Sequence, residues 1–145
     1  MTWFRRQRDA IVTAIVADLL PSHPALDAGE RVTVAADVVA FVVAQVRGLP
    51  EFLRVPYGAA AFAFDGFALL RWGRTFRMLD GARRQAYVAF WAGSPLGATR
   101  NFVKLIRSCT LLAYYDHPTV RARLETSVAP IVDPAAVIRS QAESA

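Results

Sequence analysis

The sequence predicts an all-α fold, a single-domain bundle of five to six helices with an extended C-terminal tail. Apolar residues recur at helical spacing through most of the chain, and prolines or glycines separate the periodic segments. There is no internal repeat and no segment with convincing strand alternation. At 145 residues, the chain has the usual length of one domain. We therefore expect a helical domain over residues 1–126 and an extended or partner-bound tail over residues 127–145.

The first two predicted helices cover residues 4–20 and 28–47. The first is amphipathic, and the two prolines of the segment LPSHP end it. The second is rich in valine, but its length and its alanines favour a helix over a strand. Its polar residues Thr33, Asp37 and Gln45 fall on one narrow stripe, which predicts a helix that is buried on most sides.

A third predicted helix covers residues 51–73, where Pro56 either starts the main helix or kinks it. Its middle is strongly apolar, with Asp65 as the only charged residue, and this pattern predicts a central core helix. Because burying an unpaired carboxylate is costly, we expect Asp65 to face solvent or to pair with an arginine. Arg71 and Arg74 are plausible partners, and so is a residue of another chain.

Three shorter helices complete the predicted bundle. Residues 74–79 form a linker, and Asp80 then has the position of an N-cap for the fourth helix. That helix ends at the Gly-Ser-Pro segment of residues 93–95. The fifth helix is expected from about residue 95 to residue 115, and the sixth covers about 118–126.

The composition restricts the classes of function. Hydrophobic residues make up 54% of the chain and charged residues 20%, which is more apolar than a typical soluble domain. Either the core is unusually complete or a partner covers an apolar surface. The net charge is +5, but most of the arginines are scattered along the chain, so we expect no nucleic-acid binding. The exceptions are one cluster and two pairs: Arg5, Arg6 and Arg8, Arg83 and Arg84, and Arg121 and Arg123. The single cysteine, Cys109, lies in an apolar helical run, which predicts a buried and unreactive thiol.

The N-terminal segment has two possible roles. Two neighbouring arginines precede an apolar run, but two aspartates interrupt that run and no small-residue cleavage site follows. With no clear signal peptide, we expect a cytoplasmic location unless the chain is exported together with a partner. Aromatic and basic residues beside an amphipathic helix also suit peripheral membrane contact. The residues that would make this contact are Trp3, Phe4, Arg5, Arg6 and Arg8.

The best candidate for a functional surface is the sequence AYYDHP near the end of the fifth helix. Pro118 disfavours helical geometry at His117 and cannot donate a backbone hydrogen bond. A helix-to-turn junction there would place Tyr114, Tyr115, Asp116 and His117 at one corner. The corner would dock on a partner, or it would be purely structural, with Tyr114 packed inward and Tyr115 at the edge of the core.

A wider pattern carries a resemblance to a known family. It comprises LP at residues 49–50, LDGARRQAY at 79–87, FW at 90–91 and AYYDHP at 113–118. Together these segments resemble the gluconate 2-dehydrogenase subunit 3-like family, across roughly residues 8–125. The resemblance implies a small helical subunit that accompanies a larger flavin-dependent oxidoreductase of the glucose-methanol-choline type. The FAD and the catalytic residues are then expected on that partner, and no cofactor is expected on this chain.

The main hypothesis is a non-catalytic small subunit of a heteromeric FAD-dependent oxidoreductase of the alcohol or sugar dehydrogenase type. Its expected role is to stabilise the flavin-bearing subunit or to help it mature. The sequence has no paired-carboxylate motif, metal-ligand spacing, phosphate-binding loop, nucleophile elbow or dinucleotide fingerprint, which predicts that the chain is not catalytic alone. The predicted interface residues are Tyr114, Tyr115, Asp116, His117, Trp91 and Trp72.

An alternative hypothesis is a stand-alone helical binder of an apolar small molecule. Aromatic side chains would line its cavity, as they do in many sites for sterols, lipids or terpenoids. The six candidates are Phe41, Phe62, Phe64, Phe67, Trp72 and Phe90.

Overall fold

A computed structural model describes residues 2–95 and 97–127 of the chain. In these residues the fold is all-α, as predicted, with six α-helices, one short 3₁₀-helix and no strand. The predicted tail beyond residue 127 lies outside the described residues. The elements in chain order are α1 (Thr2–Leu19), α2 (Ala28–Arg47), α3 (Glu51–Trp72), η1 (Phe76–Met78), α4 (Gly81–Ala92), α5 (Gly97–Asp116) and α6 (Pro118–Ser127).

Side-chain caps define the first residues of α2 and α4. Asp27 accepts a hydrogen bond from the backbone N–H of Glu30 at 2.8 Å, and Glu30 accepts one from the N–H of Asp27 at 3.1 Å. This reciprocal capping box fixes the start of α2. Asp80 accepts a hydrogen bond from the N–H of Arg83 at 2.9 Å, which confirms the predicted N-cap of α4. After the C-terminal end of α3, Gly73 has a φ of 66°, a left-handed conformation that suits glycine.

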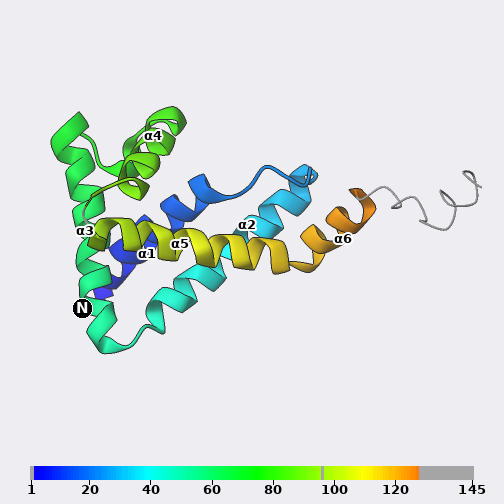
Figure 1. The fold of residues 1–145 in the computed structure, drawn as a ribbon, viewed down its shortest axis with the longest axis horizontal. Helices are drawn as coiled ribbons and strands as arrows, with labels where there is room; N and C mark the ends of the chain where they lie inside the picture. Colours follow the sequence, from blue (N-terminus) through cyan, green and yellow to red (C-terminus); the bar gives the residue numbers. More distant parts are fainter. Residues whose placement is uncertain (1, 96, 128–145) are drawn as a thin grey trace, which may run out of the picture.

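The helices form an elongated bundle with α3 across one end (Figure 1). α1, α2 and α5 pack against one another and make the body of the molecule. α4 packs on α5 and α1 near the α3 end, and α6 extends from the opposite end. Residues that are far apart in the sequence therefore meet at both ends of the bundle.

Aliphatic side chains fill the centre of the body. On α2 the buried residues recur every four positions, so they form a single stripe along the helix. α1 and α5 present their own apolar stripes to it. The main contributors are Ile11, Val12, Ile15, Val16, Val34, Val38, Val42, Val46, Val103 and Ile106.

An aromatic cluster fills the end of the core beneath α3. Phe64 has no exposed surface, and its ring centroid lies 4.8 Å from Phe76, 4.7 Å from Tyr87 and 4.9 Å from Trp91. The hydroxyl of Tyr87 donates a hydrogen bond to the carbonyl of Phe64 at 2.5 Å. Burial raises the pKa of Tyr87 far above its usual value, so this hydroxyl stays a donor. The cluster joins α3, η1 and α4 into one unit.

Two predictions about burial are wrong. α2 is not buried on most sides, because only its valine stripe faces the core and residues such as Val32 and Phe41 are exposed. α3 is not a central helix, because it crosses the end of the bundle and buries one side only. In both helices nearly every position is apolar, so the helical period could not identify the covered side. Pro56 lies inside α3 and does not start it.

The predicted pairing of Asp65 with Arg71 or Arg74 is wrong, whereas pairing with a residue of another chain stays a prediction. This carboxylate is half-buried, its Oδ1 atom is buried without a hydrogen-bond partner, and it makes no ion pair with Arg71 or Arg74. Arg71 lies six positions along α3 and therefore points to another side of the helix, whereas partners at three or four positions would have faced Asp65. Arg74 follows the end of the helix at Gly73.

Candidate interaction surfaces

A tight junction between α5 and α6 lies at the predicted Asp-His-Pro stop. α5 ends at Asp116, His117 links the two helices, and Pro118 is the first residue of α6. The Nδ1 atom of His117 accepts a hydrogen bond from the backbone N–H of Thr119 at 3.2 Å. An N-cap residue supplies an acceptor for a backbone N–H of the first helical turn, and proline is favoured at the position directly after the N-cap. The imidazole of His117 therefore caps α6.

The other ring nitrogen of His117 reaches α2. Its Nε2 atom lies 3.2 Å from Oδ2 of Asp37. Because Nδ1 is the acceptor, the hydrogen-bond network assigns the proton to Nε2, which donates to the carboxylate. Both nitrogens are thus engaged within the chain. The contact ties the α5–α6 junction to α2.

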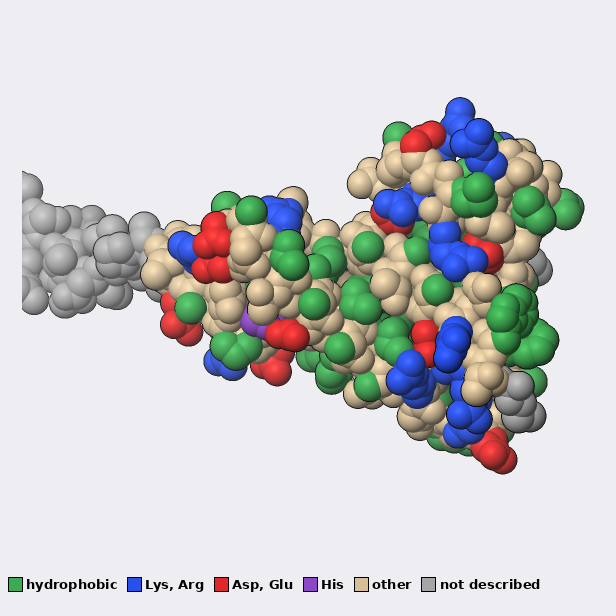
Figure 2. All heavy atoms as spheres, turned by 180° about the vertical axis from the view of Figure 1, so that it is seen from behind, with side chains coloured by type: hydrophobic (Ala, Val, Ile, Leu, Met, Phe, Trp, Pro, Cys, Tyr) green, Lys and Arg blue, Asp and Glu red, His purple; other side chains and the backbone are tan. Residues whose placement is uncertain are grey.

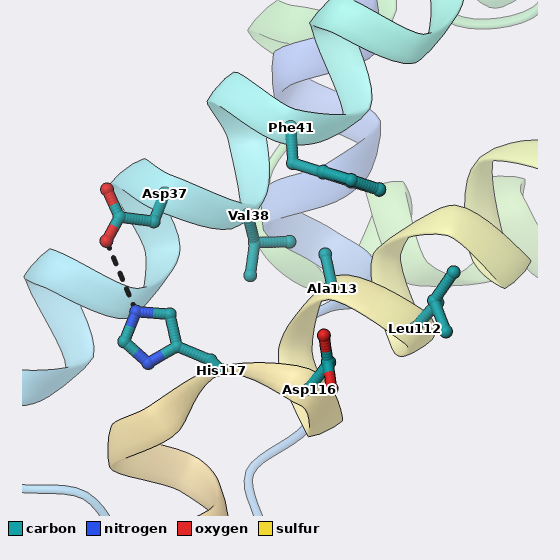
Figure 3. A pocket seen from close by; sticks show the side chains of 7 residues that line it. All are labelled: Asp37, Val38, Phe41, Leu112, Ala113, Asp116 and His117. Atoms are coloured by element: carbon teal, nitrogen blue, oxygen red, sulfur yellow. Dashed lines mark hydrogen bonds and ion pairs between the residues drawn. The ribbon is translucent and has the colours of Figure 1, made fainter.

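Asp37 and His117 border a pocket of about 300 Å³ between α2 and the end of α5 (Figure 3). Asp116 adds a second carboxylate, whereas the rest of the lining is apolar and includes the ring of Phe41. A surface with acidic and apolar sides suits a basic or amphipathic side chain of a partner. The lining residues are Asp37, Val38, Phe41, Leu112, Ala113, Asp116 and His117.

The two tyrosines of the predicted corner face different environments. Tyr114 is buried in the core, and Tyr115 is exposed with its ring edge-on to Tyr114 at 5.2 Å. Burial raises the pKa of Tyr114, and the neighbouring Tyr115 raises it further. Tyr115 lines a groove of about 430 Å³ that also includes Asp18 and Arg107. Of the four predicted corner residues, Tyr115, Asp116 and part of His117 are accessible, and Tyr114 supports them from inside.

The two tryptophans of the predicted interface also differ. Trp91 is only 5% exposed and packs on Phe64 and Tyr87, so it belongs to the aromatic cluster and offers a partner almost no surface. Trp72 is half-buried, with the guanidinium of Arg71 lying 5.3 Å from the centre of its ring. Its ring also lies edge-on to Tyr87 at 5.4 Å, so Trp72 offers a partner only part of its surface.

Sequence reasoning missed the surface that the structure shows most clearly, the outer side of α3. Phe52, Val55 and Leu70 are 76%, 74% and 85% exposed. Small residues that are also exposed separate these large ones along the same side of the helix. We call this surface the α3 face; it consists of Phe52, Val55, Ala59, Ala63, Gly66 and Leu70.

The spacing of the α3 face was visible in the sequence as a second stripe. Its members recur at intervals of three or four residues, which keeps them on one side of a helix. The buried stripe of Tyr57, Ala61, Phe64 and Ala68 has the same period on the opposite side. Two parallel apolar stripes on one helix indicate two packing partners, and within residues 2–95 and 97–127 α3 contacts only one layer (Figure 1).

A stacked ring pair extends the α3 face towards α4. Phe67 and Phe90 are both exposed, with nearly parallel rings at 3° and centroids 6.3 Å apart. Phe90 belongs to the FW segment of the family resemblance. In Figure 2, hydrophobic side chains appear along the edge of the molecule that α3 and α4 form.

The rings proposed to line an apolar cavity do not come together around one space. Phe64 is fully buried against other rings, Phe67 and Phe90 lie at the surface, and Phe41 lines the pocket beside His117. Phe62 packs instead against Phe4 at the start of α1, with ring centroids 5.9 Å apart. The five rings Phe41, Phe62, Phe64, Phe67 and Phe90 therefore do not form the shared lining that the alternative hypothesis predicts.

In the described ranges, no helix combines the length and apolarity needed to cross a membrane. The same residues contain no group of three or more His, Cys, Asp or Glu side chains placed to hold a metal ion. Burial raises the pKa of the Cys109 thiol, which keeps it protonated and poorly nucleophilic at neutral pH. Comparison with known proteins found no match among family models, curated proteins or solved structures.

Proposed function

We propose that this chain is the non-catalytic small subunit of a heteromeric FAD-dependent oxidoreductase of the alcohol or sugar dehydrogenase type. The α3 face is the observation that carries the proposal, because a partner would cover it on complex formation. The class of partner comes from the resemblance of residues 49–50, 79–87, 90–91 and 113–118 to the gluconate 2-dehydrogenase subunit 3-like family. The FAD lies on the larger partner in this proposal.

The size of the α3 face supports a protein partner. From Phe52 to Leu70 it is about 27 Å long and about 10 Å wide, or on the order of 300 Å². At about 25 cal/mol per Å², covering it contributes roughly 7 kcal/mol before the entropy lost on association is subtracted. The largest apolar patch on a monomeric protein has about this size and is often functional.

The shape and surroundings of the α3 face fit a helix of the partner. Its middle is formed by small residues, Ala59, Ala63 and Gly66, between large residues at both ends. A side-chain carbon added at Gly66 would meet nothing within 4 Å, so this part of the surface is open. Charged residues, Arg54 and Arg71, lie near its two ends. An apolar centre with a polar rim is the usual anatomy of a protein interface.

The pocket beside His117 would provide a second contact. It lies on the opposite end of the bundle from α3, with two carboxylates facing outward beside exposed Leu112. A partner that spans both surfaces would hold the bundle along its length. This arrangement would stabilise the flavin-bearing subunit without any catalytic group from this chain.

The test is an affinity purification of the tagged full-length chain from its native host, followed by an absorbance spectrum of the eluate. The proposal predicts a yellow eluate with a flavin spectrum and a much larger protein in a fixed ratio to this chain. A colourless eluate that contains this chain alone would contradict it. If the eluate is yellow, mass spectrometry would identify the larger protein, and the sequence of that protein would indicate the class of alcohol or sugar that it oxidises.

A further inference from the structure

A second pocket, of about 380 Å³, lies where the start of α1 meets the end of α2 and the start of α3. Five of its seven lining residues are arginines from three different helices. Figure 2 shows basic side chains gathered on this part of the surface around a carboxylate. We call it the arginine pocket; its lining residues are Thr2, Arg5, Arg6, Arg8, Asp9, Arg47 and Arg54.

A single carboxylate organises the floor of the arginine pocket. Arg8 donates to Oδ1 of Asp9 at 3.0 Å, and Arg47 donates to Oδ2 at 2.7 Å. Asp9 is largely buried, and so is the side chain of Arg8. Both oxygens of Asp9 are therefore occupied, and two guanidinium groups are held side by side in fixed orientations.

The other three arginines of the pocket, Arg5, Arg6 and Arg54, make no ion pair with a carboxylate of the described residues. Arg54 donates to the carbonyl of Leu49 at 3.0 Å, which orients it but leaves its charge uncompensated. Arg5 and Arg6 are exposed and make no hydrogen bond or ion pair with any described residue. Five positive charges thus face the one negative charge of Asp9.

This arrangement is unfavourable without a bound anion. The first turn of α1 contains no acidic residue, so Arg5 adds positive charge where the helix dipole is already positive. Repulsion among the guanidinium groups adds to that cost. An anion in the pocket would offset both the repulsion among the guanidinium groups and the positive charge at the start of α1. The backbone N–H groups at a helix N-terminus also favour a bound anion.

We propose that the arginine pocket binds a phosphate group. Phosphate has several oxygens arranged to accept paired hydrogen bonds from arginine, and its charge matches the excess in the pocket. The group would come from the headgroup of an anionic lipid or from a soluble phosphate compound. Trp3 and Phe4, which are exposed beside the pocket, would enter a lipid interface in the first case. The proposal does not depend on a flavin-bearing partner.

The test uses the full-length chain and the double variant Arg5→Gln/Arg6→Gln, since neither side chain supports the fold. The matched control is Arg74→Gln/Arg77→Gln, which removes the same charge from two exposed arginines outside the pocket. Calorimetric titration with inorganic phosphate and pyrophosphate measures soluble ligands. Co-sedimentation with phosphatidylcholine vesicles, with and without phosphatidylglycerol, measures lipid headgroups, both at low ionic strength.

The pocket variant should lose at least about tenfold in affinity, because charge-assisted hydrogen bonds of about 1.5–3 kcal/mol are removed. The control should stay within about twofold of the unmodified chain. Loss of vesicle binding alone identifies a lipid headgroup as the source, and loss of calorimetric binding identifies a soluble phosphate compound. Equal losses in both variants, or no saturable binding of any probe, would overturn the proposal.

Discussion

Replacing Phe64 with alanine should destabilise the bundle by about 4 kcal/mol. Phe64 has no exposed surface, and three rings lie with centroids within 5 Å of its own, those of Phe76, Tyr87 and Trp91. Phenylalanine-to-alanine changes in cores cost about 3–5 kcal/mol, depending on how far the neighbours collapse into the cavity. These rigid rings from two different elements, η1 and α4, collapse poorly, so we expect a value in the upper half of this range.

Urea unfolding followed by circular dichroism measures this loss, with an unchanged m-value as the sign that only stability has changed. In a thermal scan, the melting temperature should fall by roughly 12 °C. Phe90→Ala is the control, because Phe90 is an exposed ring stacked on Phe67. It should cost less than about 1 kcal/mol. Equal losses for the two variants would refute the view that Phe64 organises the aromatic cluster.

Two further predictions concern polar side chains. Asp18 is 8% exposed, and burial raises its pKa despite the opposing effect of Arg84, whose guanidinium lies 3.2 Å away. The folded state therefore holds the Asp18 proton more tightly than the unfolded state, so the unmodified chain loses stability as the pH rises from about 4 towards the raised pKa. Asparagine does not titrate, so the Asp18→Asn variant should not lose this stability. Urea unfolding between about pH 4 and pH 7 should therefore show the free energy of unfolding of the variant rising relative to that of the unmodified chain. A difference in unfolding free energy that does not change with pH would contradict this prediction. His117→Ala should cost about 1–2 kcal/mol by removing the cap of α6 and the contact with Asp37, whereas His117→Asn, which can still cap, should cost less than about 1 kcal/mol in the same assay.

Helix positions could be predicted from the sequence because local signals mark their ends. The length and the alanines of residues 28–47 predict a helix, and these residues form α2, which begins after the N-cap Asp27. Asp80 identified the start of α4. Pro118 located the end of α5, and the short helix predicted after it over about residues 118–126 is confirmed as α6.

The sides on which the helices pack could not be predicted, because this depends on tertiary contacts. The α3 sequence is apolar on two sides, and only the position of the other helices determines which side is covered. The contact between His117 and Asp37 joins residues that are 80 positions apart. The arginine pocket likewise gathers its charges from three helices, whereas the sequence showed only the cluster of Arg5, Arg6 and Arg8 on α1 and not that Arg47 and Arg54 join it.

The central claim, that a larger flavin-bearing protein covers the α3 face, is tested most directly by comparing two variants. Leu70→Ser changes the most exposed apolar residue of that face, and Val32→Ser changes a similarly exposed residue on α2. Both would be tagged and purified from the native host beside the unmodified chain, with the flavin absorbance of each eluate normalised to the amount of tagged chain. The account predicts that Leu70→Ser loses most of the flavin signal and that Val32→Ser retains it. Equal flavin in all three eluates would show that the partner binds elsewhere, and no flavin in any of them would contradict the proposed function itself.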